Sequence, residues 1–191
     1  MITKTDRSNT GFTLVELILT LAIASIVMVA AAPSIQVLVQ NNRLTAQTNE
    51  LVASLNLARS EAVKRAKTVT VCKSATLTNC DTTGSGDWEV GWIVFVDDNG
   101  DVDVDTGDTI VRVVDGLAAG NSLRSASTNN SLQYTGDGRV NGAQSFALCD
   151  SRGATHARAI VLTTVGRTRL GVDGDDNGTV EDLSGADVTC P

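Results

Sequence analysis

Residues 12–32 form an almost uninterrupted apolar run, and this run limits what the chain can fold into more than any other feature. Glu16 is the only charged residue within it. A helix needs about 20 predominantly apolar residues to cross the hydrocarbon core of a membrane, and the run has that length. We therefore expect residues 12–32 to form a membrane-spanning helix rather than part of a soluble core.

A short polar leader precedes this run. It carries Lys4, Asp6 and Arg7 and ends at Gly11. A charged start followed by an apolar run is typical of a secretory signal, which is normally cut at a small residue after the run. Here the small residue comes before the run, so a cut after Gly11 would remove residues 1–11 and keep the helix. The alternative is an uncleaved N-terminal membrane anchor, which hydropathy does not exclude.

Glu16 separates these interpretations. A lone carboxylate near the centre of a spanning helix costs about 2.5–3.5 kcal/mol on insertion scales, and such a residue usually has a function and a partner. The run from Gly11 to Glu16, G-F-T-L-V-E, resembles the class III signal of type IV pilins and pseudopilins. This resemblance implies that a prepilin peptidase cuts between Gly11 and Phe12 and methylates the new amino terminus. It also implies that Glu16 pairs with the N-terminal amine of a neighbouring subunit during filament assembly.

The helical pattern continues beyond the apolar run. Pro33 follows at once, and membrane helices tolerate proline. Small and apolar residues then recur at steps of three and four, which predicts an amphipathic helix to about Lys67; they are Leu44, Thr48, Leu51, Leu55, Ala58 and Ala62. We expect one long helix, with residues 12–32 in the membrane and residues 33–67 packed on a globular domain.

After Lys67 the period changes from 3.6 to 2, which predicts strands. Gly136-Asp137-Gly138 is a hairpin turn signal. Short strands at this spacing favour an antiparallel sheet packed on the helix, an α+β fold with residues 68–191 as the β domain. Large aromatic side chains are expected in its core, namely Trp88, Trp92, Phe95 and Phe146. The expected strands are residues 68–73, 88–96, 109–115, 131–135, 139–140, 144–150, 157–164 and 167–172.

A second resemblance narrows the family. Residues 43–66, followed by a strand with a cysteine and then by G-D-W-E-V-G-W-I-V-F-V-D, are similar to the GspH/FimT group of minor pilins and pseudopilins. The similarity runs from Gly11 to about Leu170, and the acidic C-terminal tail from Val172 departs from it. It implies a pilin-like, non-enzymatic subunit that crosses the inner membrane once, with its domain in the periplasm. Its partners would be other pilins or pseudopilins near the tip of a type IV pilus or a type II secretion pseudopilus.

Four cysteines are present, Cys72, Cys80, Cys149 and Cys190. The periplasm is oxidising, so an even number favours disulfides. Zinc is the alternative, but the chain has no C-x-x-C pair and its only histidine is His156. Three pairings are possible. We prefer Cys72–Cys80, which closes a short loop, with Cys149–Cys190, which pins the C-terminal tail to a core strand.

The sequence offers no catalytic set, because the carboxylates cluster in loops without an evident acid–base pair. The formal charge of −7 argues against broad nonspecific binding to nucleic acid. Acidic residues gather between positions 97 and 108 and between positions 173 and 187. In the second cluster Asp173, Asp175 and Asn177 have the spacing of an EF-hand-like Ca²⁺ loop, with Gly178 at its sharp turn. An EF-hand loop ends with a glutamate at its twelfth position, which this loop lacks, and Glu181 is a possible substitute. A solvated acidic turn is therefore an equal alternative.

The last pattern is Gly166-Arg167-Thr168-Arg169. Alternate residues of a strand share a face, so Arg167 and Arg169 would present two guanidinium groups to adjacent phosphates. The pattern resembles the C-terminal motif of DNA-binding FimT-type minor pilins, which implies DNA contact, with Arg152 and Arg158 as added cations. The alternative is an exposed strand paired with nearby aspartates.

Together these resemblances imply a FimT/FimU-like minor type IV pilin that takes part in pilus assembly or priming, with DNA capture for natural transformation as a further role. The alternative is a GspH-like minor pseudopilin of a type II secretion system.

Overall fold

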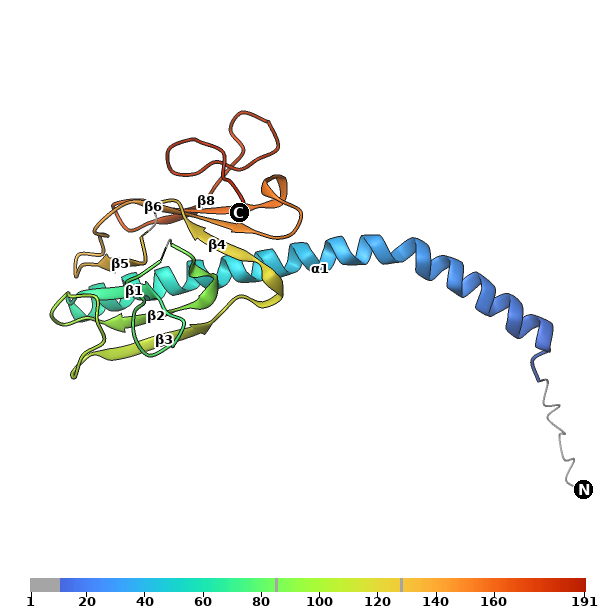
Figure 1. Cartoon of the computed structure of the whole chain (residues 1–191), viewed down its shortest axis with the longest axis horizontal. Helices are drawn as coiled ribbons and strands as arrows, with labels where there is room; N and C mark the ends of the chain where they lie inside the picture. Colours follow the sequence, from blue (N-terminus) through green and yellow to red (C-terminus); the bar gives the residue numbers. More distant parts are fainter. Residues whose placement is uncertain (1–10, 85, 128) are drawn as a thin grey trace, which may run out of the picture. The chain divides into compact units, whose positions relative to one another are not determined.

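The computed structural model describes residues 11–84, 86–127 and 129–191 (Figure 1). The expected leader, residues 1–10, lies outside the described residues. The chain divides between Asn41 and Asn42 into two compact units.

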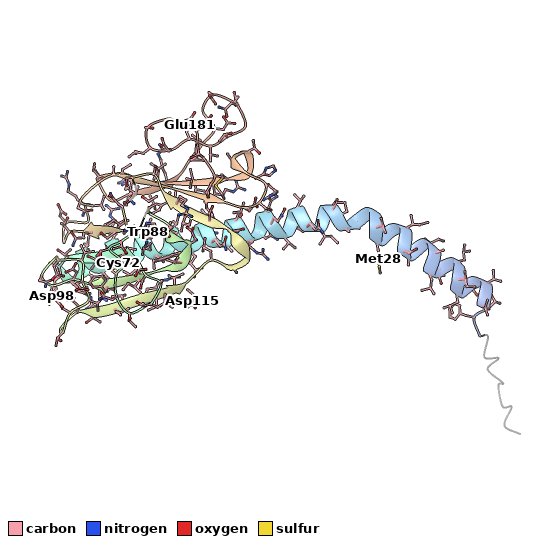
Figure 2. The ribbon with its side chains drawn as sticks, viewed as in Figure 1. Met28, Cys72, Trp88, Asp98, Asp115 and Glu181 are labelled. Carbon is pink, nitrogen blue, oxygen red and sulfur yellow. A yellow bond between two sulfur atoms is a disulfide. The ribbon has the colours of Figure 1, made fainter. Side chains whose placement is uncertain are left out.

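The first unit is helical. Helix α1 spans Leu14–Arg65, and its residues up to Asn41 belong to this unit. Thr13 caps the helix, because its hydroxyl accepts a hydrogen bond from the backbone N–H of Glu16 (3.2 Å). The apolar side chains are exposed, as Met28 illustrates in Figure 2. Within the described residues no single helix has both the length and the apolar character of a membrane span, whereas Leu14–Val29 and Ala31–Arg65, which meet at a bend, satisfy both criteria together.

The second unit contains two four-stranded antiparallel sheets. Sheet A has the strand order β3-β2-β1-β5 and sheet B the order β4-β6-β7-β8. Sheet A consists of β1 (Val69–Lys73), β2 (Gly91–Val96), β3 (Thr109–Asp115) and β5 (Ser131–Tyr134). Sheet B consists of β4 (Ser122–Ser125), β6 (Gln144–Cys149), β7 (Arg158–Leu162) and β8 (Thr168–Leu170). Short 3₁₀ turns occur at Trp88–Val90, Ala118–Gly120 and Ala154–His156.

One hydrophobic core joins both sheets to the second half of α1, which runs between them in Figure 1. The predicted helical stripe is buried at every position. Each fully buried leucine stabilises the fold by roughly 1.5–3 kcal/mol relative to exposure. Of the four aromatic residues predicted for the core, Trp88, Trp92 and Phe146 lie in it, and Trp88 packs edge-on against Phe146 with ring centroids 5.1 Å apart. Phe95 is also fully buried, but in a separate cluster with Cys72 and Ile93. The pilin-like α+β prediction is thus confirmed, with the helix held by two sheets rather than one.

Three local predictions differ from the structure. Trp88–Val90 forms a 3₁₀ turn instead of the start of a strand, because Gly91 takes φ 115° and turns the chain there. Strand β4 was not predicted. Residues 139–140 do not form a strand: Tyr134 and Val140 form one isolated bridge across the turn at 136–138.

Candidate functional site

The N-terminal motif is accessible in the first unit. Nothing lies within 4 Å of a Cβ placed on Gly11, and Phe12 is 84% exposed. Glu16 is exposed in the first turn of α1, and no described cation forms an ion pair with it. A peptidase could therefore reach the bond between Gly11 and Phe12, and the Glu16 carboxylate is available to a group from another molecule.

The arginine motif lies on the hairpin that joins β7 to β8. The N–H of Gly166 donates to the carbonyl of Thr163 (2.8 Å), and the N–H of Thr163 donates to the carbonyl of Arg167 (3.0 Å). Arg169 pairs with Val161 in register. Strand alternation places Arg167 and Arg169 on the outer face of sheet B, which we define as the face opposite α1. Both are exposed, and neither forms an ion pair with a described carboxylate.

Gly166 has a structural role. Its φ is +76°, and a Cβ at this position would overlap the carbonyl oxygen of Gly138 and come within 3.2 Å of the Tyr134 ring. A β-carbon is strained at that φ as well. The glycine of the motif is therefore explained by packing between two turns, without any contact to phosphate.

Arg152 and Arg158 do not extend the Arg167–Arg169 surface. The Nη2 of Arg152 lies 2.6 Å from Oδ2 of Asp150, and both side chains are largely buried. This guanidinium is the main reason that the pKa of Asp150 lies below its usual range. Arg158 precedes the buried residues of β7 on the α1 side of sheet B, and it lines a groove of about 260 Å³ with residues of α1. Arg152 thus forms an ion pair with Asp150, and Arg158 lies on the opposite face of sheet B from Arg169.

The structure contains the disulfides Cys72–Cys80 and Cys149–Cys190, the pairing that the sequence analysis prefers. The second holds the C-terminal tail, residues 172–191, against sheet B. The tail folds back on itself, since the N–H of Val188 donates to the carbonyl of Val180 (3.0 Å). Its apolar side chains cover small residues on the outer face, including Cys149 and Ala159. Glu181 marks this tail in Figure 2.

The proposed calcium ligands are occupied by hydrogen bonds inside the tail. Asp173 accepts from the N–H groups of Asn177 (3.1 Å) and Gly178 (2.7 Å), and Asp175 accepts from the Asn177 side chain (2.9 Å). Glu181 accepts from the N–H of Gly174 (3.1 Å). The part of the chain that the structure describes has no group of three or more histidine, cysteine or acidic residues able to hold a metal. These side chains therefore stabilise the acidic turn from within.

Sequence reasoning missed the role of Asp97. This carboxylate is fully buried and accepts hydrogen bonds from the hydroxyl of Thr70 (2.7 Å), the N–H of Gly100 (2.6 Å) and the side chain of Gln133 (3.1 Å). It therefore organises the first acidic loop from inside. Its only sequence signal was its position directly after an apolar strand, which is where a turn begins.

Comparison with known proteins supplies the context for these sites. The family model described as type II transport protein GspH matches residues 47–166, and the prokaryotic N-terminal methylation motif matches residues 6–32. No curated protein sequence matches this chain.

Among solved structures, the type IV minor pilin FimU of Pseudomonas aeruginosa is similar in two crystal forms. One shares 25% identity and a TM-score of 0.55, over 70% of this chain and 91% of FimU. The other shares 22% identity and a TM-score of 0.53, over 67% and 92%, and shows the fold alone. The minor pseudopilin EpsH of the Vibrio cholerae type 2 secretion system shares 11% identity and a TM-score of 0.48, over 70% of this chain and 99% of EpsH.

Proposed function

The chain belongs to the GspH family of minor pilins and pseudopilins, and from this premise we propose that it is a minor type IV pilin that takes part in pilus assembly or priming. Members of the family are structural subunits, so the chain acts by assembly and not by catalysis. The observation that carries the choice of a pilus is the similarity to FimU, at 25% identity over 91% of that minor pilin. The alternative is the GspH-like pseudopilin role in type II secretion.

The N-terminal methylation motif and the apolar helix indicate a prepilin anchored in the inner membrane. We propose the following order along the chain: a leader of residues 1–11, a membrane segment of residues 12–32, an amphipathic helical segment of residues 33–67 and a periplasmic domain of residues 68–191. Glu16 would pair with the amine of a neighbouring pilin. The exposed carboxylate in the first turn of α1 supports this role.

Deletion of the gene tests the proposal against its alternative. A strain without this chain should lose most surface pili in sheared preparations, and expression of the full chain should restore them. Secretion of type II substrates into the medium should be unchanged. The reverse result, intact pili with blocked secretion, would contradict the pilus role and support the pseudopilin.

We propose DNA contact as a second role, because Arg167 and Arg169 are exposed and neither is paired with a described carboxylate. Phosphate contacts of this kind position a protein on DNA without reading its sequence. Binding should therefore be similar for duplexes of different sequence and should weaken as salt rises.

A further inference from the structure

Strand β3 forms an unprotected edge of sheet A (Figure 1). The other three edge strands of the two sheets are protected. Asp87 forms a bridge to β4 and Val140 a bridge to β5, and β8 has only three residues, which makes it a poor template for a further strand. Strand β3 has seven residues and, in the part of the chain that the structure describes, no strand or bridge on its outer side. Alternate residues of this edge therefore offer backbone N–H and carbonyl groups to another strand.

A bulge restricts the usable edge to the second half of β3. Val111 has no partner in the register between β2 and β3, whereas Arg112–Asp115 pairs regularly with β2. A bulge twists its strand and discourages pairing with a further one. Val113, within the regular half, is an apolar β-branched residue that is 46% exposed. A strand added here would cover it, and we refer to residues 112–115 as the open edge of β3.

A groove of about 380 Å³ adjoins the open edge. Gln47 and Glu50 of α1 line it together with the chain from Val113 to Ala118. The Nε2 of Gln47 donates to the carbonyl of Ala118 (3.5 Å), which links the helix to the segment after β3. When an extended peptide adds to a sheet edge, its backbone supplies affinity and its side chains enter neighbouring pockets. The groove is such a pocket for a strand that adds to β3.

The groove is acidic, because its lining residues include two carboxylates and no cation. Glu50 has a side chain that is 43% exposed, and its ion pair with Arg112 is long, at 3.7 Å between Oε1 and Nη2. Asp115, labelled in Figure 2, is exposed and forms no ion pair with a described cation. Charges across an interface are arranged to be complementary. A lysine or arginine side chain is therefore the one that suits this groove.

A second copy of this chain does not suit the open edge. Figure 1 shows β3 lying along the second half of α1, and Arg112 reaches Glu50 of that helix. Antiparallel pairing of β3 with β3 of another copy requires a twofold axis perpendicular to the strands, which reverses the direction of the helix. The two copies of Asn42, where the chain enters this unit, would then lie at opposite ends of the pair. Both N-terminal segments belong in one membrane, so the partner is a different subunit.

We propose that the open edge of β3 accepts an extended, basic segment of another subunit of the pilin class. The segment adds as a fifth strand of sheet A and places a lysine or arginine in the groove, near Glu50 and Asp115. Main-chain hydrogen bonds hold the segment, and the groove selects its side chain. The inference rests on the proposed role in assembly and assigns to it a surface and the chemistry of its partner.

The test is photo-crosslinking of the full chain in cells of its own host. With p-benzoylphenylalanine in place of Val113, irradiation should attach the chain to a peptide of another pilin or pseudopilin, with a lysine or arginine beside the attachment point. Mass spectrometry of the digested product identifies that peptide. Val165 is the matched control position, since it is also an exposed valine, at 50%, but lies in the turn between β7 and β8. The same photoreactive residue there should not capture the peptide.

Two charge variants test the groove. Asp115→Asn should lower the yield of the crosslinked product several-fold, because the basic segment loses a counter-charge. Asp176→Asn is its control: it removes one exposed carboxylate from the C-terminal tail, and it should leave the yield unchanged. Melting temperatures equal to that of the wild type show that neither variant is misfolded.

The remaining outcomes overturn the proposal. They are a crosslinked dimer of this chain, a peptide from a protein outside the pilin class, an undiminished yield in Asp115→Asn, and no product from position 113. The proposed function fails separately. A peptide from a pseudopilin would support the open edge and contradict the pilus role, whereas loss of pili on gene deletion without a product from position 113 would keep the pilus role and remove the open edge.

Discussion

At the scale of single residues, substitution of Gly166 tests whether this glycine of the arginine motif is needed for the packing of the fold. Gly166→Ala adds a Cβ where φ is +76° and where the carbonyl of Gly138 leaves no room. We expect the free energy of unfolding to fall by about 2 kcal/mol or more, from backbone strain and displacement of the neighbouring turn. Urea unfolding followed by tryptophan fluorescence measures the change.

Gly142→Ala is the control for this prediction. Nothing lies within 4 Å of a Cβ at Gly142, and its φ is not in the left-handed region. The substitution should change the free energy of unfolding by less than about 0.5 kcal/mol. Equal stability of the Gly166 and Gly142 variants would contradict the packing explanation and return Gly166 to a role in ligand contact.

The Asp150–Arg152 pair predicts a dependence of stability on pH. The guanidinium lowers the pKa of Asp150 below the ordinary value of 3.8, so the stabilisation is present above that value and is lost as pH falls through the lower folded pKa. Arg152→Gln should therefore lower the melting temperature at neutral pH, and the difference from wild type should shrink as the pH falls below 3.8 and the carboxylate is protonated.

Arg158→Gln serves as the control, because Arg158 is exposed and forms no ion pair with a described carboxylate. Its melting temperature should follow the wild type at every pH. A gap between Arg152→Gln and wild type that stays constant down to pH 2 would mean that Arg152 acts through packing and not through the charge of Asp150.

The residue roles that could be predicted are those that depend on the local sequence, and the roles that were missed depend on contacts between distant segments. The cysteine pairing was preferred because Cys72–Cys80 closes a short local loop, which leaves Cys190 to pin the tail to the strand that carries Cys149. The helical stripe was predicted because it depends on spacing within one element. The contact of Gly166 with Gly138 links residues that are distant in the sequence. The face of sheet B on which Arg158 lies depends on the register of β7 against β6. Neither leaves a local signal.

At the scale of elements, the two disulfides should stabilise the second unit unequally. Cys149 and Cys190 are separated by 41 positions, and Cys72 and Cys80 by 8. In the chain-entropy model the longer loop contributes roughly 1.5 kcal/mol more, within an ordinary range of about 2–4 kcal/mol for each bridge. Replacing both members of each pair by serine, one pair at a time, allows the comparison in urea unfolding.

Each pair has one deeply buried member, Cys72 or Cys149, so the cost of burying serine is similar in both variants. The Cys149–Cys190 variant should also lose protection of the C-terminal tail from limited proteolysis, since that bridge holds the tail on sheet B. A greater loss of stability in the Cys72–Cys80 variant would show that strain or local packing outweighs loop entropy here.

Elements were predicted where periodicity was strong and missed where it was short or interrupted. The strand pattern from Trp88 to Val96 looked continuous, but Gly91 approaches the backbone of β3 so closely that a Cβ would meet the carbonyl of Val114 at 2.7 Å. Strand β4 has only four residues and buries one large apolar side chain, Leu123. Its existence depends on pairing with β6, which no local pattern reveals.

At the scale of the whole molecule, processing decides whether the chain can enter a filament. The methylation motif matches residues 6–32, and Gly11 and Phe12 are exposed. Mass spectrometry of the membrane-extracted protein should find a mature chain that begins with N-methylated Phe12. Gly11→Val should leave the leader attached. Recovery of intact Met1 from a host with an active prepilin peptidase would contradict the cut.

Glu16 then tests assembly independently of processing. The pairing proposed for it requires a carboxylate near the start of α1 and the free amine of a neighbouring subunit. Glu16→Ala removes the carboxylate and its insertion cost of up to about 2.5–3.5 kcal/mol, so the variant should still be cleaved and retained in the membrane. Its amount in sheared filaments, measured by immunoblot against the membrane pool, should fall strongly because the neighbouring amine loses its counter-charge.

Two further variants separate charge from shape. Glu16→Gln, which keeps the shape without the charge, should be incorporated into filaments as poorly as Glu16→Ala, whereas Glu16→Asp should retain part of the incorporation. Wild-type incorporation of Glu16→Gln would show that charge pairing is not what places this subunit in the filament, and the apolar surface of the helix would then have to account for assembly.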